Sequence, residues 1–337
     1  MKLIIPMAGR GTRLRPHTHV TPKPLIPVRG TSMVERIIDT FGEVLPRSLD
    51  EAVFILGPDF GQGVRDRLTE IAERHQMTSD FAVQERAEGT AHAVAQAADH
   101  LRGECLIVFA DTLFYMDEQP DLEASDAVVW VKHVDDPRRF GVVVENDRGE
   151  ITDFVEKPSE PISNQAIIGI YYVKEGERLR TEIDGIMRDD LRGHGGEFQL
   201  TDALDRMLKA GATFRTAAVS EWLDAGTIPA LKETTKVILD KERDQPRDGA
   251  VENSVVIEPV YVGPDAVVRD SVVGPYVAVH GGAEVSGSVL KNTIVFADAT
   301  VADSALDDAV IGQSAVVRQY AGPLNIGDHA TAGPVDG

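Results

Sequence analysis

Two glycines and three basic side chains lie close together near the N-terminus of this 337-residue chain. Gly9 and Gly11 follow a short apolar stretch, and Arg13, Arg15 and Lys23 come soon after them. Glycine lets backbone N–H groups approach phosphate oxygens without a Cβ in the way, and guanidinium and ammonium groups neutralise the phosphate charge. The segment therefore predicts a binding site for a polyanion such as a triphosphate.

Two well-known phosphate loops do not fit this segment. A Walker loop requires Lys and then Ser or Thr after its last glycine, whereas Thr12 and Arg13 follow Gly11. A dinucleotide fingerprint requires a third glycine at the position of Leu14. A bare G-x-G pattern is also compatible with an ordinary turn from strand to helix with solvated arginines.

Two aspartates are candidates for binding a divalent cation. Asp111 follows the apolar run 106–110, at the tip of a predicted buried strand, where an unpaired charge is costly. Asp224 lies in the segment 221–227. Magnesium typically takes one or two carboxylates together with substrate phosphates. Taken singly, either aspartate could instead belong to a turn or cap a helix.

These segments resemble those of the sugar-1-phosphate nucleotidylyltransferases, the enzymes that make NDP-sugars. The pattern A-G-x-G-T-R-L-x-P begins at Ala8, and the block P-K-P-L-x-P-V begins at Pro22. The segment around Asp224 resembles the family's W-x-D-x-G-T block, and Ala110 replaces the glycine that usually precedes the aspartate at 111. The resemblance implies transfer of a nucleoside monophosphate from a nucleoside triphosphate to a sugar 1-phosphate, with Mg²⁺ and release of pyrophosphate.

The resemblance also implies a role for each matching residue. Arg13 would grip the triphosphate, Lys23 would bridge the phosphates near the reacting centre, and Arg15 would be a charge at the rim. The metal ligands would be Asp111 and Asp224. The remaining expected contacts are to the nucleotide, from Ala8, Gly9, Gly11, Thr12, Gln84 and Gly89, and to the sugar phosphate, from Gly141, Glu156, Lys157 and Gly169.

The nucleotide is expected to carry a pyrimidine. The amide of Gln84 can both donate and accept, so it can pair with the imide edge of thymine or uracil. dTTP is favoured over UTP, and glucose 1-phosphate is the favoured sugar substrate. His92 and His194 lack the spacing of metal ligands and are assigned no catalytic role. The alternatives are a GDP-mannose-type enzyme, a bifunctional nucleotidyl- and acetyltransferase, or a non-catalytic regulatory homologue.

Composition restricts the partners and the compartment. The net charge of −21 argues against nucleic acid, because a phosphate backbone would be repelled. No apolar run reaches the ~20 residues that span a bilayer. A single cysteine, Cys105, excludes an intrachain disulfide and favours a reducing cytoplasm. The acidic surface is compatible with a cytoplasm at high salt. It is equally compatible with an acidic protein in a cytoplasm at ordinary salt.

The first 240 residues alternate predicted strands and helices, which indicates a Rossmann-like, mostly parallel α/β sheet covered on both faces. Ligands of such sheets bind beyond the carboxyl ends of the strands. A helical periodicity is visible from Val64 to Ala72, and residues 91–101 favour a helix. The predicted strands lie at residues 3–6, 52–56, 81–84, 106–110 and 127–131.

Small aliphatic residues recur every five or six positions from about Val251 onward. Three such steps make 16 or 17 residues, the length of one triangular coil of a parallel β-helix, so about three coils and a tail are expected. The repeat resembles the left-handed hexapeptide β-helix. We therefore expect a nucleotidyltransferase domain at residues 1–242, a left-handed β-helix at 250–337, and a homo-oligomer formed through the β-helix.

Overall fold

The structure is a computed structural model, and it describes residues 1–9 and 11–334. The chain divides into two compact units. The first unit comprises Met1–Gly9 and Glu35–Trp222, and the second comprises the described residues of Arg10–Val34 and Leu223–Gly337. Within the described part of the chain, no helix has both the length and the apolar character needed to cross a membrane.

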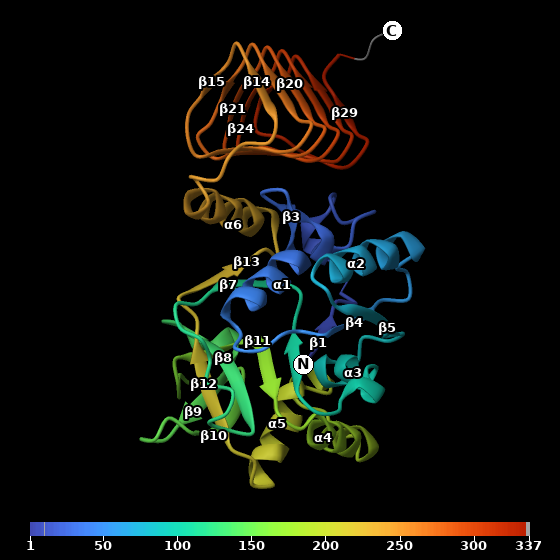
Figure 1. Cartoon of the computed structure of the whole chain (residues 1–337), viewed down its shortest axis with the longest axis vertical. Coiled ribbons are helices and arrows are strands. Elements are labelled where there is room, and N and C mark those ends of the chain that lie inside the picture. Colours follow the sequence, from blue (N-terminus) through green and yellow to red (C-terminus); the bar gives the residue numbers. More distant parts are fainter. Residues whose placement is uncertain (10, 335–337) are drawn as a thin grey trace. The chain divides into compact units, whose positions relative to one another are not determined.

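The first unit is built on a nine-stranded mixed sheet (Figure 1). The strand order is β10-β9-β11-β6-β1-β4-β5, and β8 pairs with both β11 and β12. The strands are β1 (Lys2–Pro6), β4 (Glu51–Leu56), β5 (Thr78–Val83), β6 (Cys105–Val108), β8 (Ala127–His133), β9 (Gly141–Glu145), β10 (Ile151–Glu156), β11 (Gln165–Val173) and β12 (Phe214–Ala218).

The parallel half of this sheet confirms the α/β prediction. β1 is parallel to β4 and β6, and β4 is parallel to β5. The continuous apolar sequences of β1, β4 and β6 are buried, as expected of strands covered on both faces, whereas the edge strand β5 is only partly buried. The sequence did not indicate the antiparallel half, in which β11 pairs with β6, β8 and β9.

Helices pack on the sheet through residues that alternate along the strands. On β8, Val129 and Val131 join the core formed with α3, α4 and α5, whereas Trp130 points to the opposite face and meets Phe41 of α1 edge-on at 6.2 Å. The helices are α1 (Met33–Val44), α2 (Gln62–Arg74), α3 (Thr90–Ala95), α4 (Gly176–Arg188) and α5 (Leu200–Lys209).

The two helical expectations had different outcomes. The predicted apolar face of α2 is confirmed, since Leu68, Ile71 and Ala72 are buried. The helix expected over residues 91–101 is shorter, because α3 ends at Ala95 and a 3-10 turn, η3 (Ala98–His100), follows it. There the N–H groups of residues 97 and 100 donate to carbonyls three residues back, at 3.0 and 2.9 Å.

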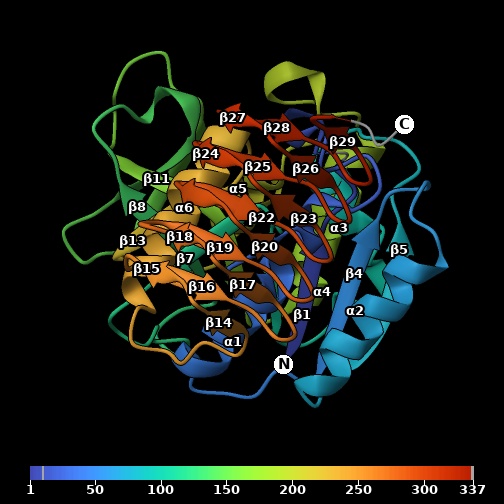
Figure 2. The ribbon, with the colours of Figure 1, turned by 90° about the horizontal axis from the view of Figure 1, so that it is seen from above.

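The C-terminal part of the second unit is a parallel β-helix of three sheets, whose strands lie in register along its length (Figure 2). The sheets are β14-β17-β20-β23-β26-β29, β15-β18-β21-β24-β27 and β16-β19-β22-β25-β28. The first sheet starts at β14 (Ala250–Glu252) and reaches β29 (Thr331–Ala332). The left hand of the coil stays a prediction.

The expectation of about three coils is wrong, because two of the sheets contain five strands each and the third contains six. The period is confirmed: Ala250 pairs with Val267, and Val267 pairs with Glu284. Val251, Val256 and Ile326, which are only partly buried, also pack on the β-helix core.

One corner of the β-helix stacks serine side chains. The hydroxyl of Ser288 donates to the carbonyl of Ser286 at 2.7 Å and accepts from the N–H of Ser304 at 3.1 Å. The same pattern places Ser271 Oγ 3.0 Å from the N–H of Ser288. We call this row the serine ladder; its members are Ser254, Ser271, Ser288 and Ser304.

The second unit also contains the segment with Gly11, Arg13 and Lys23, and one long helix, α6. The domain boundary predicted between residues 242 and 250 stays a prediction. By compactness, however, residues 11–34 group with the β-helix. The elements that precede the β-helix here are η1 (Thr12–Leu14), η2 (Lys23–Leu25), β2 (Pro27–Val28), β3 (Thr31–Ser32) and α6 (Ile228–Lys241), while β13 (Glu221–Asp224) spans the border of the units.

Candidate functional site

The carboxyl end of β1 leads directly into the glycine-rich segment. The N–H of Met7 still donates to the carbonyl of Ile55 at 2.9 Å, and Ala8 and Gly9 follow outside the strand. A Cβ at Gly57 would lie 3.1 Å from the Ala8 carbonyl oxygen, so the neighbouring loop approaches this backbone closely. A Cβ at Gly9 would meet nothing within 4 Å, which leaves open space beside its backbone.

Within the second unit, Gly11 is packed against Lys23. Gly11 has a φ of +57°, and a Cβ there would lie 2.9 Å from the Cβ of Lys23. The hydroxyl of Thr18 donates to the Gly11 carbonyl at 2.8 Å. Lys23 itself is only 7% exposed, whereas Thr12 is exposed at the start of η1. The glycine therefore permits a tight contact between two predicted phosphate-binding residues.

Arg13 and Asp224 flank a third glycine of the same unit. A Cβ at Gly226 would lie 2.9 Å from Asp224 Oδ1 and 3.4 Å from Arg13 Nη2. Asp224 Oδ1 accepts the N–H of Gly226 at 2.7 Å, so the turn role considered for this aspartate is present. Thr227 caps α6 through a 3.3 Å bond from the N–H of Ala230. Gly226, which the sequence analysis did not single out, thus leaves room for the side chains of Asp224 and Arg13.

A pocket in the first unit brings together four of the residues assigned to the metal and the sugar. Asp111, Gly141, Glu156 and Gly169 all line a hollow of about 390 Å³. Its walls combine apolar and aromatic side chains with a similar number of polar and charged ones. The other lining residues are Thr90, Phe109, Thr112, Arg139, Phe140, Ile167, Ile168, Tyr171, Gln199, Thr201 and Trp222.

Glu156 depends on the absence of a side chain at Gly141. The two residues are paired across β9 and β10, and a Cβ at Gly141 would lie 2.8 Å from Glu156 Oε2. The same oxygen accepts from the hydroxyl of Thr201 at 3.4 Å. Lys157 follows at a φ of +45°, with its Nζ 3.6 Å from Glu156 Oε1. Lys157 is therefore a neighbour of the pocket through Glu156.

The expectation that Asp111 is a buried charge is wrong. β6 ends at Val108, so Asp111 lies beyond the strand and is exposed, although it still lines the pocket. Gly169 lies opposite, at a φ of +82° within a register shift of β11, and a Cβ there would lie 3.4 Å from Phe109. The position of Asp111 at the carboxyl end of β6 agrees with the expected place of a ligand.

Gln84 and Gly89, the two residues predicted to read the base, contact each other. Gln84 is 8% exposed, and its Nε2 donates to the Gly89 carbonyl at 3.3 Å. It also lies 3.1 Å from Nδ1 of His92, which orients the amide. Gly89 has a φ of +121°, and a Cβ there would lie 2.3 Å from the carbonyl oxygen of Phe198. His92, given no catalytic role from the sequence, is thus a positioning candidate.

Two ionisable groups near Glu156 have raised pKa values. Burial raises the pKa of the Asp202 carboxyl, and the negative charge of Glu156 adds to this effect. Burial also raises the pKa of the Tyr171 phenol, with a smaller contribution from Glu156. Both shifts act against the charged forms of these two groups.

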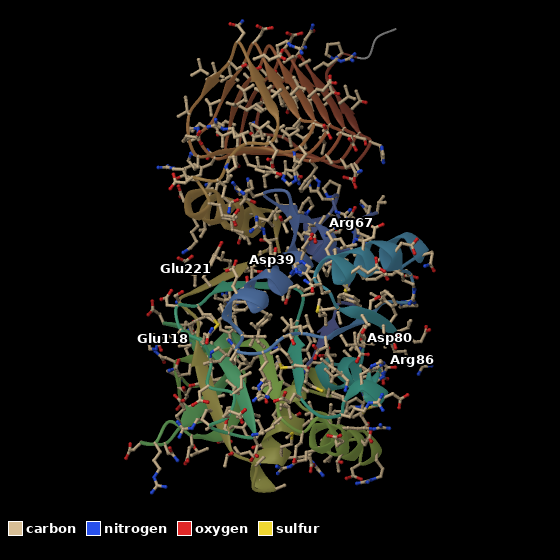
Figure 3. All side chains as sticks on the ribbon, in the orientation of Figure 1. Asp39, Arg67, Asp80, Arg86, Glu118 and Glu221 are labelled. Carbon is tan, nitrogen blue, oxygen red and sulfur yellow. The ribbon has the colours of Figure 1, made fainter. Side chains whose placement is uncertain are left out.

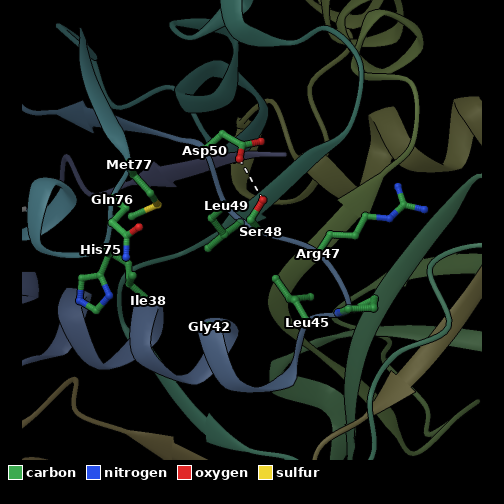
Figure 4. Close-up of a pocket in the computed structure, with 11 residues that line it drawn as sticks. Ile38, Gly42, Leu45, Arg47, Ser48, Leu49, Asp50, His75, Gln76 and Met77 are labelled. Carbon is green, nitrogen blue, oxygen red and sulfur yellow. Dashed lines mark hydrogen bonds between the residues drawn. The ribbon is translucent and has the colours of Figure 1, made fainter.

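A second hollow in the first unit, of about 630 Å³, lies beside the start of β4 (Figure 4). Its charged groups are already paired. Arg47 forms ion pairs with Glu104 and Glu123, and Asp50 binds the N-terminal amino group as well as the hydroxyl of Ser48. It lies at the amino end of the strand, opposite the edge where ligands of such sheets bind.

One cluster among the described residues has the ligand types and spacing for a metal ion: Glu51, Asp80 and His100. Its ligand atoms lie within 4.8 Å of one another (Asp80 is labelled in Figure 3). His100 Nδ1 lies 2.9 Å from Glu51, and Nε2 lies 3.3 Å from Asp80. The His100 ring thus lies between the two carboxylates and contacts both, which explains this arrangement without a metal. Glu51 also begins β4, at the edge away from Asp111 and the pocket.

Comparisons with known proteins decide the family. A sequence model described as nucleotidyl transferase matches residues 2–241. The chain belongs to the nucleotidyl transferase family. The bifunctional protein GlmU of Methanocaldococcus jannaschii is 31% identical over 77% of this chain, which spans 59% of that relative's length.

Two other similar proteins are covered by this chain over more of their own length. Glucose-1-phosphate thymidylyltransferase of Streptomyces griseus is 27% identical over 98% of this chain and 99% of that protein. A crystal structure from Bacillus anthracis, assigned as a glucose-1-phosphate thymidylyltransferase and bound to sucrose, has a TM-score of 0.58 and 27% identity. It covers 70% of this chain and 94% of that one. The predicted resemblance is confirmed.

The roles of individual residues in this nucleotidyl transferase stay predictions. The structure shows to which of the two compact units each residue belongs. Gly11, Thr12, Arg13, Arg15, Lys23 and Asp224 belong to the second unit, and the other predicted site residues belong to the first. The sequence missed the aromatic wall, where Phe140 meets Trp222 edge-on at 4.9 Å. Trp222 begins the W-x-D-x-G-T block and Phe140 directly precedes the predicted contact Gly141, so their positions in the sequence could have indicated them.

Proposed function

We propose that this protein transfers a nucleoside monophosphate from dTTP, or next UTP, to a hexose 1-phosphate, with glucose 1-phosphate favoured. The observation that carries the proposal is the pocket that joins Asp111 to Gly141, Glu156 and Gly169. The full-length similarity to a glucose-1-phosphate thymidylyltransferase supports it. The products are an NDP-sugar and pyrophosphate.

The proposed reaction is a single displacement at the α-phosphorus. A phosphate oxygen of the sugar 1-phosphate forms a bond to that phosphorus, and the bond to the bridging oxygen of pyrophosphate breaks. The electron pair leaves with pyrophosphate, whose growing negative charge Arg13 and Lys23 would stabilise. Glu156 would accept hydrogen bonds from sugar hydroxyls, and Lys157 would hold the sugar phosphate. The chain's contribution is therefore positioning and charge neutralisation.

The residues proposed for the metal fit Mg²⁺ by their chemistry. Asp111 presents an exposed carboxylate in the pocket, and Asp224 an exposed carboxylate whose Oδ1 binds the Gly226 N–H. Carboxylate oxygens are the ligands that Mg²⁺ prefers. When bound, the ion would neutralise phosphate charge and help to align the reacting groups.

We propose that Gln84 reads the base through its amide, with the backbone of Gly89 completing the contact. The bond to His92 holds the amide at one orientation. A pyrimidine fits this donor and acceptor pattern. dTTP and UTP differ by one methyl and one hydroxyl group, so we expect a modest preference between them.

The test is pyrophosphate release with Mg²⁺ over a grid of nucleoside triphosphates and sugar 1-phosphates. We expect the highest rate with dTTP and glucose 1-phosphate. Asp111→Asn should lower kcat by about 100-fold or more, because a neutral amide stabilises the cation and the transition state poorly. Asp147→Asn, in an exposed turn after β9, is the matched control and should retain activity. No release from any pair would refute the proposal.

Acetyl transfer is the second candidate, since the β-helix has five coils and a relative is named as bifunctional. Against it, His280 is 2% exposed among aromatic rings, with Phe296 at 5.3 Å. Acetyl-CoA consumption with an amino-sugar phosphate acceptor would support this activity. We further propose a cytoplasmic location. We also propose self-association through the β-helix, which measurement of the molecular mass in solution can test.

A further inference from the structure

The segment that carries Arg13 and Lys23 is fixed to the β-helix within the second unit. His17 is 1% exposed, and its Nε2 lies 2.7 Å from Asn325 Oδ1 on β28 (Asn325–Ile326). Since that amide oxygen only accepts, the ring nitrogen donates. The His17 ring also packs edge-on against Phe296, at 5.5 Å between centroids.

Close packing between Pro16 and Gly327 reinforces this anchor. A Cβ at Gly327, in the last coil, would lie 2.8 Å from the Cβ of Pro16. The space between coil and segment is therefore filled at this point, with no room for another side chain. Two neighbouring residues of the segment, Pro16 and His17, thus contact two neighbouring parts of the same coil, Asn325 and Gly327.

A second anchor lies at the other end of the segment. Arg29, which is 9% exposed, donates to the side chains of Glu242 and Gln245, each at 2.7 Å. Its guanidinium also lies over the ring of Tyr261, 5.1 Å from the centroid. A Cβ at Gly30 would lie 2.1 Å from the Tyr261 hydroxyl. The segment is therefore held at both ends by the β-helix and the residues that precede it.

A short chain of contacts links the first anchor to the proposed phosphate site. Thr18 follows His17 directly, and its hydroxyl donates to the Gly11 carbonyl at 2.8 Å. Gly11 in turn packs against Lys23, and the N–H of Leu14 donates to Gly11 at 2.9 Å. Displacement of His17 therefore displaces Thr18, and with it the turn that presents Arg13.

We propose that His17 is a positioning residue for the triphosphate: by binding Asn325 of the last coil, it makes the β-helix part of the machinery that holds Arg13 and Lys23. The inference rests on the proposed function for its catalytic consequence. It predicts that the β-helix contributes to the binding of the nucleotide and not of the sugar phosphate.

The protonation state of His17 suits this role. Burial lowers the pKa of His17, while the bond to Asn325 and the charge of Asp328 oppose that change. The imidazole is thus neutral near pH 7 and donates from Nε2. Its other nitrogen, Nδ1, is buried with no hydrogen-bond partner among the described residues, so one bond defines the orientation of the ring.

The test compares His17→Leu, which removes the bond, with His17→Gln, whose amide can replace Nε2 as a donor. We expect His17→Leu to raise KM for dTTP about tenfold, as loss of a buried hydrogen bond allows. KM for glucose 1-phosphate should stay within about twofold, and His17→Gln should restore most of the dTTP affinity. Ser288→Ala is the control, because it weakens the β-helix at a corner whose side-chain bonds join residues of the β-helix alone.

Hydrogen exchange separates this inference from the proposed function. The amides of Leu14 and His19, bonded at 2.9 and 3.2 Å, should exchange faster in His17→Leu than in the wild type or Ser288→Ala. If the wild type releases no pyrophosphate with any substrate pair, the proposed function fails, and dTTP binding together with exchange decides the inference. Unchanged KM for dTTP in an active enzyme, or unchanged exchange, would overturn it. Equal loss of affinity for both substrates would also overturn it.

Discussion

At the scale of single residues, glycines decide where the charged groups can lie. Gly141 leaves room for the carboxylate of Glu156, and Gly226 leaves room for Asp224 and Arg13. In both places a Cβ would lie under 3 Å from a carboxylate oxygen. These contacts give the glycines a role that differs from the close backbone approach expected of Gly9 and Gly11.

Gly141→Ala tests this packing. The added Cβ would meet Glu156 Oε2 at 2.8 Å, so the carboxylate must move away from the sugar hydroxyls that we propose it binds. We expect KM for glucose 1-phosphate to rise about tenfold. Gly63→Ala is the matched control, since a Cβ there meets nothing within 4 Å. Equal kinetics of the two variants would contradict the proposed role of Glu156.

His17 predicts a pH dependence of stability. Burial lowers its pKa in the folded protein below the usual 6.5, so the unfolded chain binds the proton more tightly. The free energy of unfolding is therefore greatest above pH 6.5 and falls as the pH drops through the folded pKa. We expect the Tm to decrease from pH 7.5 to 5, and His17→Gln to reduce this slope. Parallel profiles of Tm against pH for the wild type and His17→Gln would count against a buried, neutral His17.

At the scale of elements, the β-helix combines an aliphatic interior with polar corners. Each inner serine of the ladder both donates within its own turn and accepts from the next coil, so backbone N–H groups at the corner are satisfied without water. The row is buried at Ser271, Ser288 and Ser304. The ladder therefore couples the register of successive coils.

Ser288→Ala should destabilise the β-helix by about 1–3 kcal/mol, because it leaves the N–H of Ser304 buried without its acceptor. Chemical denaturation followed by circular dichroism measures this loss. Ser254→Ala, at the partly exposed end of the ladder, should cost less. A larger loss at residue 254 than at 288 would argue against a role for the ladder.

At the scale of the whole molecule, the charge balance is the dominant feature. A net charge of −21 places like charges near one another over the surface, and salt screens this repulsion. We expect the Tm to rise by several degrees when potassium chloride is raised from low to molar concentration. Sucrose at equal osmolality is the control. A Tm that does not respond to salt would contradict an adaptation to high salt.

Local patterns explain which features could be predicted. The strands before Gly9 and Asp111, the apolar face of α2 and the period of the β-helix depend on residues that are near one another in sequence. The number of coils was underestimated because the first and last coils carry only partly buried aliphatics, such as Val251 and Ile326. The antiparallel pairing of β11 could not be predicted, since register depends on distant strands.

The sequence alone determined the family and the two architectures, and it supplied the predicted residues for phosphate, metal and sugar, because these follow from motifs and periodicity. Only the tertiary structure decided that Asp111 is exposed, that His92 orients Gln84 and that Glu156 lies over Gly141. It also decided that His17 binds Asn325, 308 positions away. Contacts of this kind depend on packing between distant segments, which local spacing does not encode.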